Sequence, residues 1–147
     1  MKHDKLDKIL NLTLEFAEGN SEILALGLCG SWARGTAKMD SDIDLSILVK
    51  DKLRFKNTDW TEDLEFEKIN ESIEYFKDKV YGEVWSRHVF LNSNTEIEFA
   101  FADRSWADTE NLDEGTRKVV SDGFKILYDP EQILNKLVEK VKIVSEQ

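Results

Sequence analysis

Two aspartates that lie two residues apart, Asp42 and Asp44, stand at the start of an apolar segment that runs to Val49. Side chains alternate between the two faces of a strand, so a strand here turns both carboxylates to one side and its apolar residues to the other. Adjacent carboxylates repel each other unless a cation lies between them. Mg²⁺ prefers carboxylate oxygens together with substrate phosphates. The pair therefore predicts a site for divalent metal ions.

A glycine-bounded segment before these aspartates offers donors for phosphate oxygens. Gly30 lets the backbone approach a ligand closely, and Ser31 offers a hydroxyl and an amide at the start of a short predicted helix. Ser31 is either such a ligand or only a helix N-cap. Arg34 is either a bidentate phosphate ligand or a surface ion-pair partner. Phosphate donors beside metal-binding carboxylates suit in-line displacement at phosphorus with two metal ions.

The segments Gly30-Ser-Trp-Ala-Arg-Gly35 and Ser41-Asp-Ile-Asp-Leu45 resemble the signature of the nucleotidyltransferase superfamily whose best-known member is DNA polymerase beta. They are similar to its small stand-alone members, the aminoglycoside nucleotidyltransferases and the minimal nucleotidyltransferases of toxin–antitoxin pairs. The resemblance implies an α/β (α+β) fold, with a mixed sheet covered by helices. It also implies catalytic metal ligands at Asp42 and Asp44, and nucleotide-binding residues at Gly30, Ser31, Arg34 and Ser41.

The superfamily pattern further implies a third acidic residue on a later strand beside the aspartate strand. Glu98, in a predicted strand over 95–102, is our choice, and Glu96 is the rival. Glu98 would help to hold the catalytic metal or take the proton of the acceptor. The alternative is that both glutamates lie on a solvated strand face. Ala100 and Ala102, on the same face as Glu98, would leave room for a ligand.

These residues predict a Mg²⁺-dependent enzyme that transfers a nucleoside monophosphate from an NTP, ATP by default, to a hydroxyl and releases pyrophosphate. The net charge of −10 and the absence of a basic cluster argue against a nucleic-acid substrate. They favour a small cationic acceptor such as an aminoglycoside, bound in a pocket that a homodimer could share. The alternative is an antitoxin-type enzyme that binds a partner protein and nucleotidylates or neutralises it. An inactive nucleotide-binding relic is a third interpretation, which the intact carboxylates disfavour.

The length of 147 residues predicts one domain over 1–147. A single cysteine, Cys29, cannot form an internal disulfide, and no segment resembles a membrane helix or a signal peptide. The sequence therefore predicts a cytoplasmic protein. Cys29 ends a buried strand and is expected to be a small core residue rather than a nucleophile. No P-loop, zinc-ligand or serine-hydrolase pattern is present.

Hydrophobic periodicity predicts the elements that position these residues. His88 shares a strand face with Ser86 and, having no partner apparent in the sequence, is expected to be structural or half-exposed. Trp85 and Trp106 are expected to be core or rim aromatics, either of which could stack on a base or a sugar. The expected helices lie over 4–17, 60–80, 111–123 and from Pro130 onward, the expected strands over 23–29, 43–49, 82–91, 95–102 and 124–128, and a charged loop over 50–59.

Overall fold

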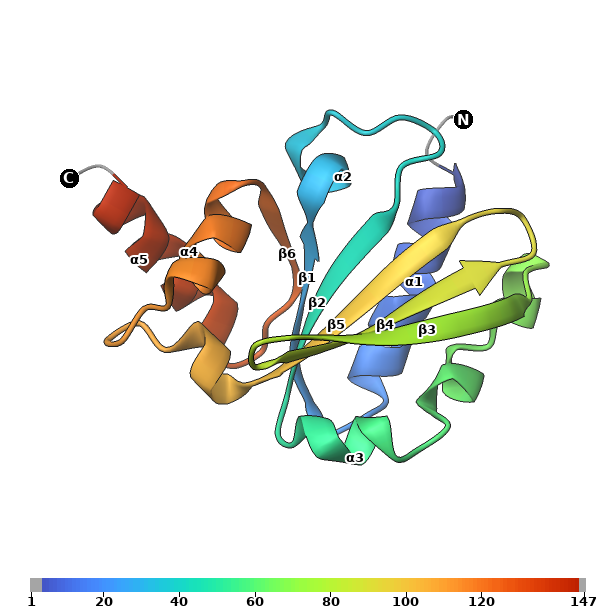
Figure 1. The fold of residues 1–147 in the computed structure, drawn as a ribbon, viewed down its shortest axis with the longest axis horizontal. Coiled ribbons are helices and arrows are strands. Elements are labelled where there is room, and N and C mark those ends of the chain that lie inside the picture. The colour runs from blue at the N-terminus through green and yellow to red at the C-terminus, as the bar shows by residue number, and fades with distance from the viewer. Residues whose placement is uncertain (1–3, 146–147) are drawn as a thin grey trace.

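The computed structural model describes residues 4–145, which form a six-stranded mixed sheet with helices around it (Figure 1). The strand order is β3-β4-β5-β2-β1-β6; β2 and β5 are parallel, and every other neighbouring pair is antiparallel. This arrangement confirms the expected mixed-sheet α+β fold. The strands are β1 (Ile23–Cys29), β2 (Ile43–Val49), β3 (Ile73–Tyr81), β4 (Val84–Leu91), β5 (Glu96–Asp103) and β6 (Phe124–Tyr128).

The helices include two long ones and several short ones. The helices predicted over 4–17, over 111–123 and from Pro130 onward are confirmed as helices, although some of them begin or end at other residues than predicted. No helix within residues 4–145 is long and apolar enough to cross a membrane. The helices are α1 (Asp4–Glu18), α2 (Gly30–Arg34), α3 (Lys52–Lys56), α4 (Glu114–Ser121) and α5 (Ile133–Ser145), with 3-10 turns η1 (Trp60–Leu64), η2 (Phe66–Ile69) and η3 (Arg104–Ala107).

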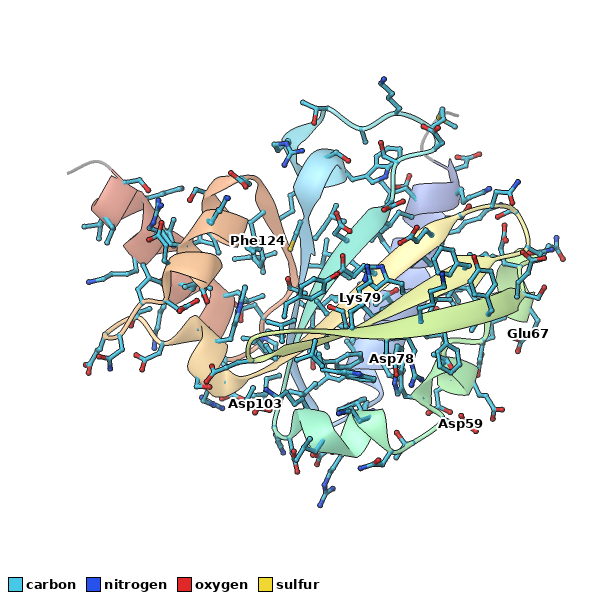
Figure 2. The ribbon with its side chains drawn as sticks, in the orientation of Figure 1. Asp59, Glu67, Asp78, Lys79, Asp103 and Phe124 are labelled. Carbon is cyan, nitrogen blue, oxygen red and sulfur yellow. The ribbon has the colours of Figure 1, made fainter. Side chains whose placement is uncertain are left out.

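The helix predicted over 60–80 is wrong, because this segment forms η1, η2 and the edge strand β3. Asp78 and Lys79 lie on opposite sides of β3 (Figure 2). Phe76, two residues before Asp78, shares the side of Asp78. On the first side, Arg87 of β4 lies 4.0 Å from the ring centre of Phe76 and donates two hydrogen bonds to Asp78, at 2.8 and 3.0 Å. Phe76 of β3 thus packs on the buried side chain of Arg87, and not against another helix as the sequence predicted.

Two smaller predictions also need correction. The predicted loop over 50–59 contains α3, whose N-cap Asp51 accepts a hydrogen bond from an amide of the first turn. The last helix begins at Ile133, later than the predicted start at Pro130. Asp129 nevertheless accepts hydrogen bonds from two amides of that helix, at 3.0 and 2.8 Å. The capping residue was therefore identified correctly, but the chain makes a turn before the helix starts.

The two faces of the sheet are covered differently. Helix α1 and η1 cover one face, where Phe16 and Trp60 pack in the main core with Phe99. Helices α4 and α5 lie together at the β6 end of the sheet (Figure 1), and Leu134 and Leu137 belong to a second core on the other face. The part of this second face over β4, β5 and β2 is left for a cavity.

Candidate active site

Four side chains lie next to one another across the middle of the sheet. His88 of β4 is opposite Glu98 of β5, Glu98 is opposite Asp44 of β2, and Asp44 is opposite Cys29 of β1. Residues paired in this way share one face of a sheet, with Cβ atoms about 5 Å apart. We call these four residues the carboxylate row. The structure thus brings Glu98 beside Asp44.

Asp44 and Glu98 form a crowded carboxyl pair. Burial, followed by the charges of Glu98 and Asp42 and a hydrogen bond from Asp44 to Glu98, raises the pKa of Asp44 to about 7. Within residues 4–145 no group of three or more His, Cys, Asp or Glu side chains is close enough to hold a metal alone. Mg²⁺ is commonly held by one or two carboxylates with waters and phosphates completing its shell. These oxygens therefore fit Mg²⁺ that arrives with a polyphosphate.

Asp42 lies at the mouth of the site. It precedes the first residue of β2 and is exposed. Partial burial and the charge of Glu96 are the main causes that raise its pKa, with Glu98 and Asp40 adding to the shift and His88 opposing it. Asp42 is therefore close enough to both glutamates to feel their charges.

His88 lies between the two candidate glutamates. Its Nδ1 is 2.9 Å from Glu96 Oε2, and its Nε2 is 3.6 Å from Glu98 Oε2. Glu96 thus contacts His88, whereas Glu98 faces both His88 and Asp44. Sequence analysis found no partner for His88. The two strands predicted over 82–91 and 95–102 pair in the structure, and their register puts His88 directly opposite Glu98.

Gly30 joins β1 to α2 in a conformation that only glycine adopts easily. Its φ is +70°, and a Cβ added there would lie 2.5 Å from Asp44 Oδ2. The N-cap of α2 is Cys29, whose side chain makes no capping hydrogen bond. Ser31 is therefore within the first turn and is not the N-cap, and the first amides of α2 have no side-chain cap.

Arg34, at the end of α2, is held against the turn that follows α4. Its Nη1 donates a hydrogen bond to the carbonyl of Asp122 at 2.9 Å. A Cβ added at Gly123 would come within 2.4 Å of Arg34 Cγ, so this contact also depends on a glycine. Arg34 forms no ion pair with any residue in the part of the chain that the structure describes. It borders the cavity described below.

Ser41 closes the turn that leads to Asp42. Its Oγ accepts a hydrogen bond from the amide of Lys38 at 2.8 Å, and its carbonyl accepts one from Trp32 Nε1 at 3.2 Å. Neither Ser31 nor Ser41 is part of the cavity wall. Ser41 therefore shapes the segment that presents Asp42, with its hydroxyl already engaged.

Cys29 is a buried member of the carboxylate row. Its Sγ lies 2.9 Å from Ser46 Oγ. Burial is the main cause that raises its pKa to about 12, with the charges of Asp44 and Glu98 adding to the effect. The thiolate form is therefore scarce at neutral pH, in agreement with a small core residue rather than a nucleophile.

A cavity of about 520 Å³ opens on this face of the sheet. Asp44, Glu98, Gly30 and Arg34 line one end of it. Ala100 and Ala102 form part of its floor, as the sequence predicted, and Trp106 is on its wall, whereas Trp85 is buried. Its volume falls in the range typical of small-molecule sites. The remaining lining residues are Cys29, Leu45, Ser46, Ile47, Tyr81, Val84, Ser86, Val119 and Asp122.

Comparison with known proteins finds one family model that matches part of this chain. Residues 11–81 match the family model described as polymerase beta, nucleotidyltransferase. The match includes Gly30, Asp42 and Asp44 and ends before Glu98. No curated protein matches the sequence.

Three solved structures are similar to this fold. An aminoglycoside 6-adenyltransferase from Bacillus subtilis aligns with a TM-score of 0.52 and 16% identity, over 67% of this chain and 35% of that one. A cytoplasmic RNA terminal U-transferase aligns with a TM-score of 0.50 and 17% identity, over 82% and 32%. A toxin–antitoxin structure with AMP-PNP aligns with a TM-score of 0.47 and 17% identity, over 93% and 86%. The chain spans about a third of the length of the two transferases, and these likenesses extend to the fold alone.

Proposed function

Since this chain carries a polymerase beta-type nucleotidyltransferase domain, we propose that it transfers a nucleoside monophosphate from an NTP, with ATP as the default donor, to a hydroxyl group. Pyrophosphate is the second product. The observation that carries the proposal is the pairing of Asp44 with Glu98 on parallel neighbouring strands, beside Gly30 and at one end of a cavity of about 520 Å³. The inactive relic is disfavoured because the carboxylates and the cavity are both present.

In the proposed complex, the triphosphate lies at the Gly30 end of the cavity. The uncapped amides at the start of α2 and the Ser31 hydroxyl donate to phosphate oxygens, and Arg34 adds a cationic donor. Asp42 and Asp44 would hold two Mg²⁺ ions, with Glu98 as a further ligand. When bound, these ions supply charge neutralisation for the phosphates and lower the pKa of the attacking hydroxyl.

The chemical step is an in-line displacement at the α-phosphorus. The acceptor oxygen forms a bond to this phosphorus while the bond to the bridging α–β oxygen breaks, so pyrophosphate leaves with the electron pair. The acceptor proton passes to Glu98, when this residue is the general base, or to water. Positioning and charge neutralisation supply most of the rate. Glu96 is the alternative to Glu98 in this role, although its neighbour is His88 rather than Asp44.

A small cationic acceptor, such as an aminoglycoside, is the first candidate for the hydroxyl substrate. The mouth of the site has a negative potential, since Asp42 lies there and the charges of Glu96 and Asp40 are near enough to raise its pKa. The net charge of −10 adds to this field. Such a field raises the local concentration of cations and their association rate.

A hydroxyl on a partner protein is the second candidate, and the edge strand β3 favours it. Tyr75, Phe76, Val80 and Tyr81 of this strand are between 46% and 65% exposed. Exposed apolar side chains on an unpaired sheet edge are typical of surfaces that bind another chain. Isolation of the protein from its native source would separate the candidates: a stoichiometric partner that becomes labelled by [α-³²P]ATP supports a protein acceptor, and an unaccompanied protein that labels aminoglycosides supports a small one.

The direct test of the proposal measures pyrophosphate release from ATP and Mg²⁺ with a panel of hydroxyl acceptors. Wild-type protein should release pyrophosphate, and Asp44→Asn should lower the rate by about 100-fold or more because the metal loses a charged ligand. Glu139→Gln, a neutralised exposed carboxylate on α5, is the matched control and should keep the wild-type rate. Equal rates for wild type and Asp44→Asn would overturn the assignment.

A further inference from the structure

A tyrosine hydroxyl of the protein itself lies beside the carboxylate row. Tyr81 is the last residue of β3, at the hairpin that joins this strand to β4, and it lines the same cavity as Asp44 and Glu98. Its phenol oxygen is 3.5 Å from His88 Nε2, and the same nitrogen is 3.6 Å from Glu98 Oε2. A single ring nitrogen therefore separates this phenol from the carboxylate that is proposed to take the proton of the acceptor.

The register of the hairpin explains how Tyr81 reaches this position. Tyr81 is at the hairpin tip, whereas His88 is paired with Lys77, four residues farther back along β3. Ser86 lies between the tip and His88 on the same face of the sheet. The side chains of Tyr81 and His88 extend toward each other over Ser86, which is fully buried. The phenol therefore points along the sheet toward the carboxylate row, although Tyr81 is 49% exposed.

Contacts from outside the hairpin hold its tip in place. Lys52 of α3 donates a hydrogen bond from its Nζ to the carbonyl of Glu83, which lies in the turn of the hairpin. The amide of Lys52 also donates to Asp103 Oδ1 at 2.9 Å, so the start of α3 connects the tip to the end of β5. A nucleophile that is held near the reacting groups reacts without the entropy cost that a free one has.

The two other tyrosines of the chain do not have this placement. Tyr75 is on the same strand and face as Tyr81 and is equally exposed at 49%, but its ring stacks on Phe90 with the ring centres 4.4 Å apart. Tyr128 is on β6, at the other edge of the sheet. The cavity lining contains Tyr81 and neither of the others. Proximity to the reacting groups therefore distinguishes Tyr81 from an equally exposed tyrosine.

We propose that Tyr81 is a self-modification site, where the protein transfers a nucleoside monophosphate from the NTP to its own phenol oxygen. The inference rests on the proposed function and names one acceptor for it. The phenol oxygen forms a bond to the α-phosphorus while the bond to the bridging α–β oxygen breaks, and pyrophosphate leaves with the electron pair. The phenol proton passes to Glu98 or to water, as for any other acceptor. The product is a tyrosine phosphodiester whose nucleotide occupies the cavity, so the modified protein is closed to a second acceptor.

The test incubates the purified protein with Mg²⁺ and ATP labelled at the α-phosphate, without any added acceptor. We expect each wild-type molecule to release a single pyrophosphate and to gain a single AMP group, which mass spectrometry of proteolytic peptides should locate on Tyr81. Tyr81→Phe removes only the hydroxyl and should lower the label by about tenfold or more. Tyr75→Phe, which removes the equally exposed phenol of the same strand, is the matched control and should be labelled like wild type.

Dilution and mixing distinguish transfer within one molecule from transfer between molecules. The first-order rate constant of labelling should not change over about a tenfold dilution of the protein, because the phenol is attached to the site. Asp44→Asn has the acceptor phenol but lacks a metal ligand. A mixture of wild type with a larger, tagged Asp44→Asn should therefore label wild type alone, and label on the tagged variant would overturn the proposal.

The outcomes separate this inference from the function on which it rests. Pyrophosphate release with added acceptors but no label on Tyr81, or equal labelling of wild type and Tyr81→Phe, overturns the self-modification site and leaves the nucleotidyltransferase proposal standing. Absence of pyrophosphate release both with and without acceptors overturns both proposals. Label on Tyr81 that dilution does not change and that Tyr81→Phe loses supports the site. Thermal unfolding verifies that each variant is folded, and if Tyr81→Phe does not fold, the labelled peptide of wild type decides the question.

Discussion

Gly30 and Asp44 form one geometric unit, because the Asp44 carboxylate fills the space that a side chain at position 30 would take. A Cβ added to Gly30 would lie 2.5 Å from Asp44 Oδ2. Gly30 also has a φ of +70°, which disfavours any residue with a Cβ. The glycine that leads into α2 is therefore required for the placement of a carboxylate on β2.

We predict that Gly30→Ala displaces Asp44 and lowers the rate of pyrophosphate release by about tenfold or more, since small shifts of reacting groups cost this much. The positive φ should also destabilise the fold by about 1–3 kcal/mol. The rate is measured at a temperature where the variant is folded, as verified by circular dichroism. Urea unfolding gives the change in stability.

Gly35→Ala is the matched control for this substitution. Gly35 has a φ of +79° and no atom within 4 Å of an added Cβ, so the variant has the same backbone strain without the contact to Asp44. It should lose similar stability and keep its rate. If both variants lose activity to the same degree, backbone strain in α2 rather than displacement of Asp44 is the cause.

Asp44 should make the metal-free protein less stable as the pH rises. Its pKa is raised to about 7 in the folded protein, mainly by burial and by the charge of Glu98, whereas the unfolded value is about 3.9. The folded state thus binds the proton more tightly. This contribution to stability is fully present below the unfolded pKa and is lost as the pH rises through about 7.

Asp44→Asn should therefore stabilise the metal-free protein at alkaline pH. At about pH 8 we expect a gain of about 1 kcal/mol, reduced from the full linkage because Asp44 is partly exposed, or a few degrees in Tm. The gain should shrink as the pH falls and vanish below the unfolded pKa of about 3.9, where the wild-type carboxyl is protonated in both states. Thermal unfolding in EDTA across this pH range measures it. Addition of Mg²⁺ with ATP should raise the Tm of wild type more than that of Asp44→Asn. If Asp44→Asn is less stable than wild type at alkaline pH in EDTA, the prediction is wrong.

The segment from Gly30 to Asp44 could be interpreted from the sequence because its information is local. Glycine spacing, an apolar strand on each side and the alternation of Asp42 with Asp44 are short-range patterns, and the structure has the strands at the predicted bounds. The cavity floor at Ala100 and Ala102 followed from the same alternation. In these places the strand period alone determines which side chains share a face.

The errors arose in two situations. In one, the spacing of apolar residues fits both a helix and a strand; in the other, the pairing register of two strands decides which residues lie opposite each other. Phe76 and Val80 are four residues apart, a spacing that suits one face of a helix and also one face of a strand, so apolar periodicity could not identify β3. The relation of His88 to Glu98 depends on which residues of β4 and β5 pair, and a shift of one residue would move His88 to the other face. Tertiary register is set by the whole hairpin and its packing, and is not encoded in a single strand.

Register also provides a test of the third carboxylate. Glu98 is the partner of Asp44 across the parallel pair, whereas Glu96 is paired with Phe90 and contacts His88. We predict that Glu98→Gln lowers the rate by about 100-fold, as expected for a group at the reacting centre. Glu96→Gln, its isosteric counterpart two residues away, should cost about tenfold or less. The reverse order, measured by pyrophosphate release at saturating Mg²⁺, would assign the role to Glu96.

His88 should act as a positioning residue for Glu98 because its ring lies between the two glutamates, with Nδ1 at 2.9 Å from Glu96 and Nε2 at 3.6 Å from Glu98. Without this ring, Glu98 is free to turn away from Asp44. We predict that His88→Ala raises the Mg²⁺ concentration for half-maximal rate by about tenfold, with a smaller loss of kcat at saturating Mg²⁺. Mn²⁺ binding followed by electron paramagnetic resonance should weaken in parallel, since it reports the ligands without turnover. Lys77→Gln, at the residue opposite His88 on β3, is the control and should leave both readouts unchanged. If His88→Ala lowers stability but leaves the Mg²⁺ dependence of the rate unaltered, His88 contributes only to packing.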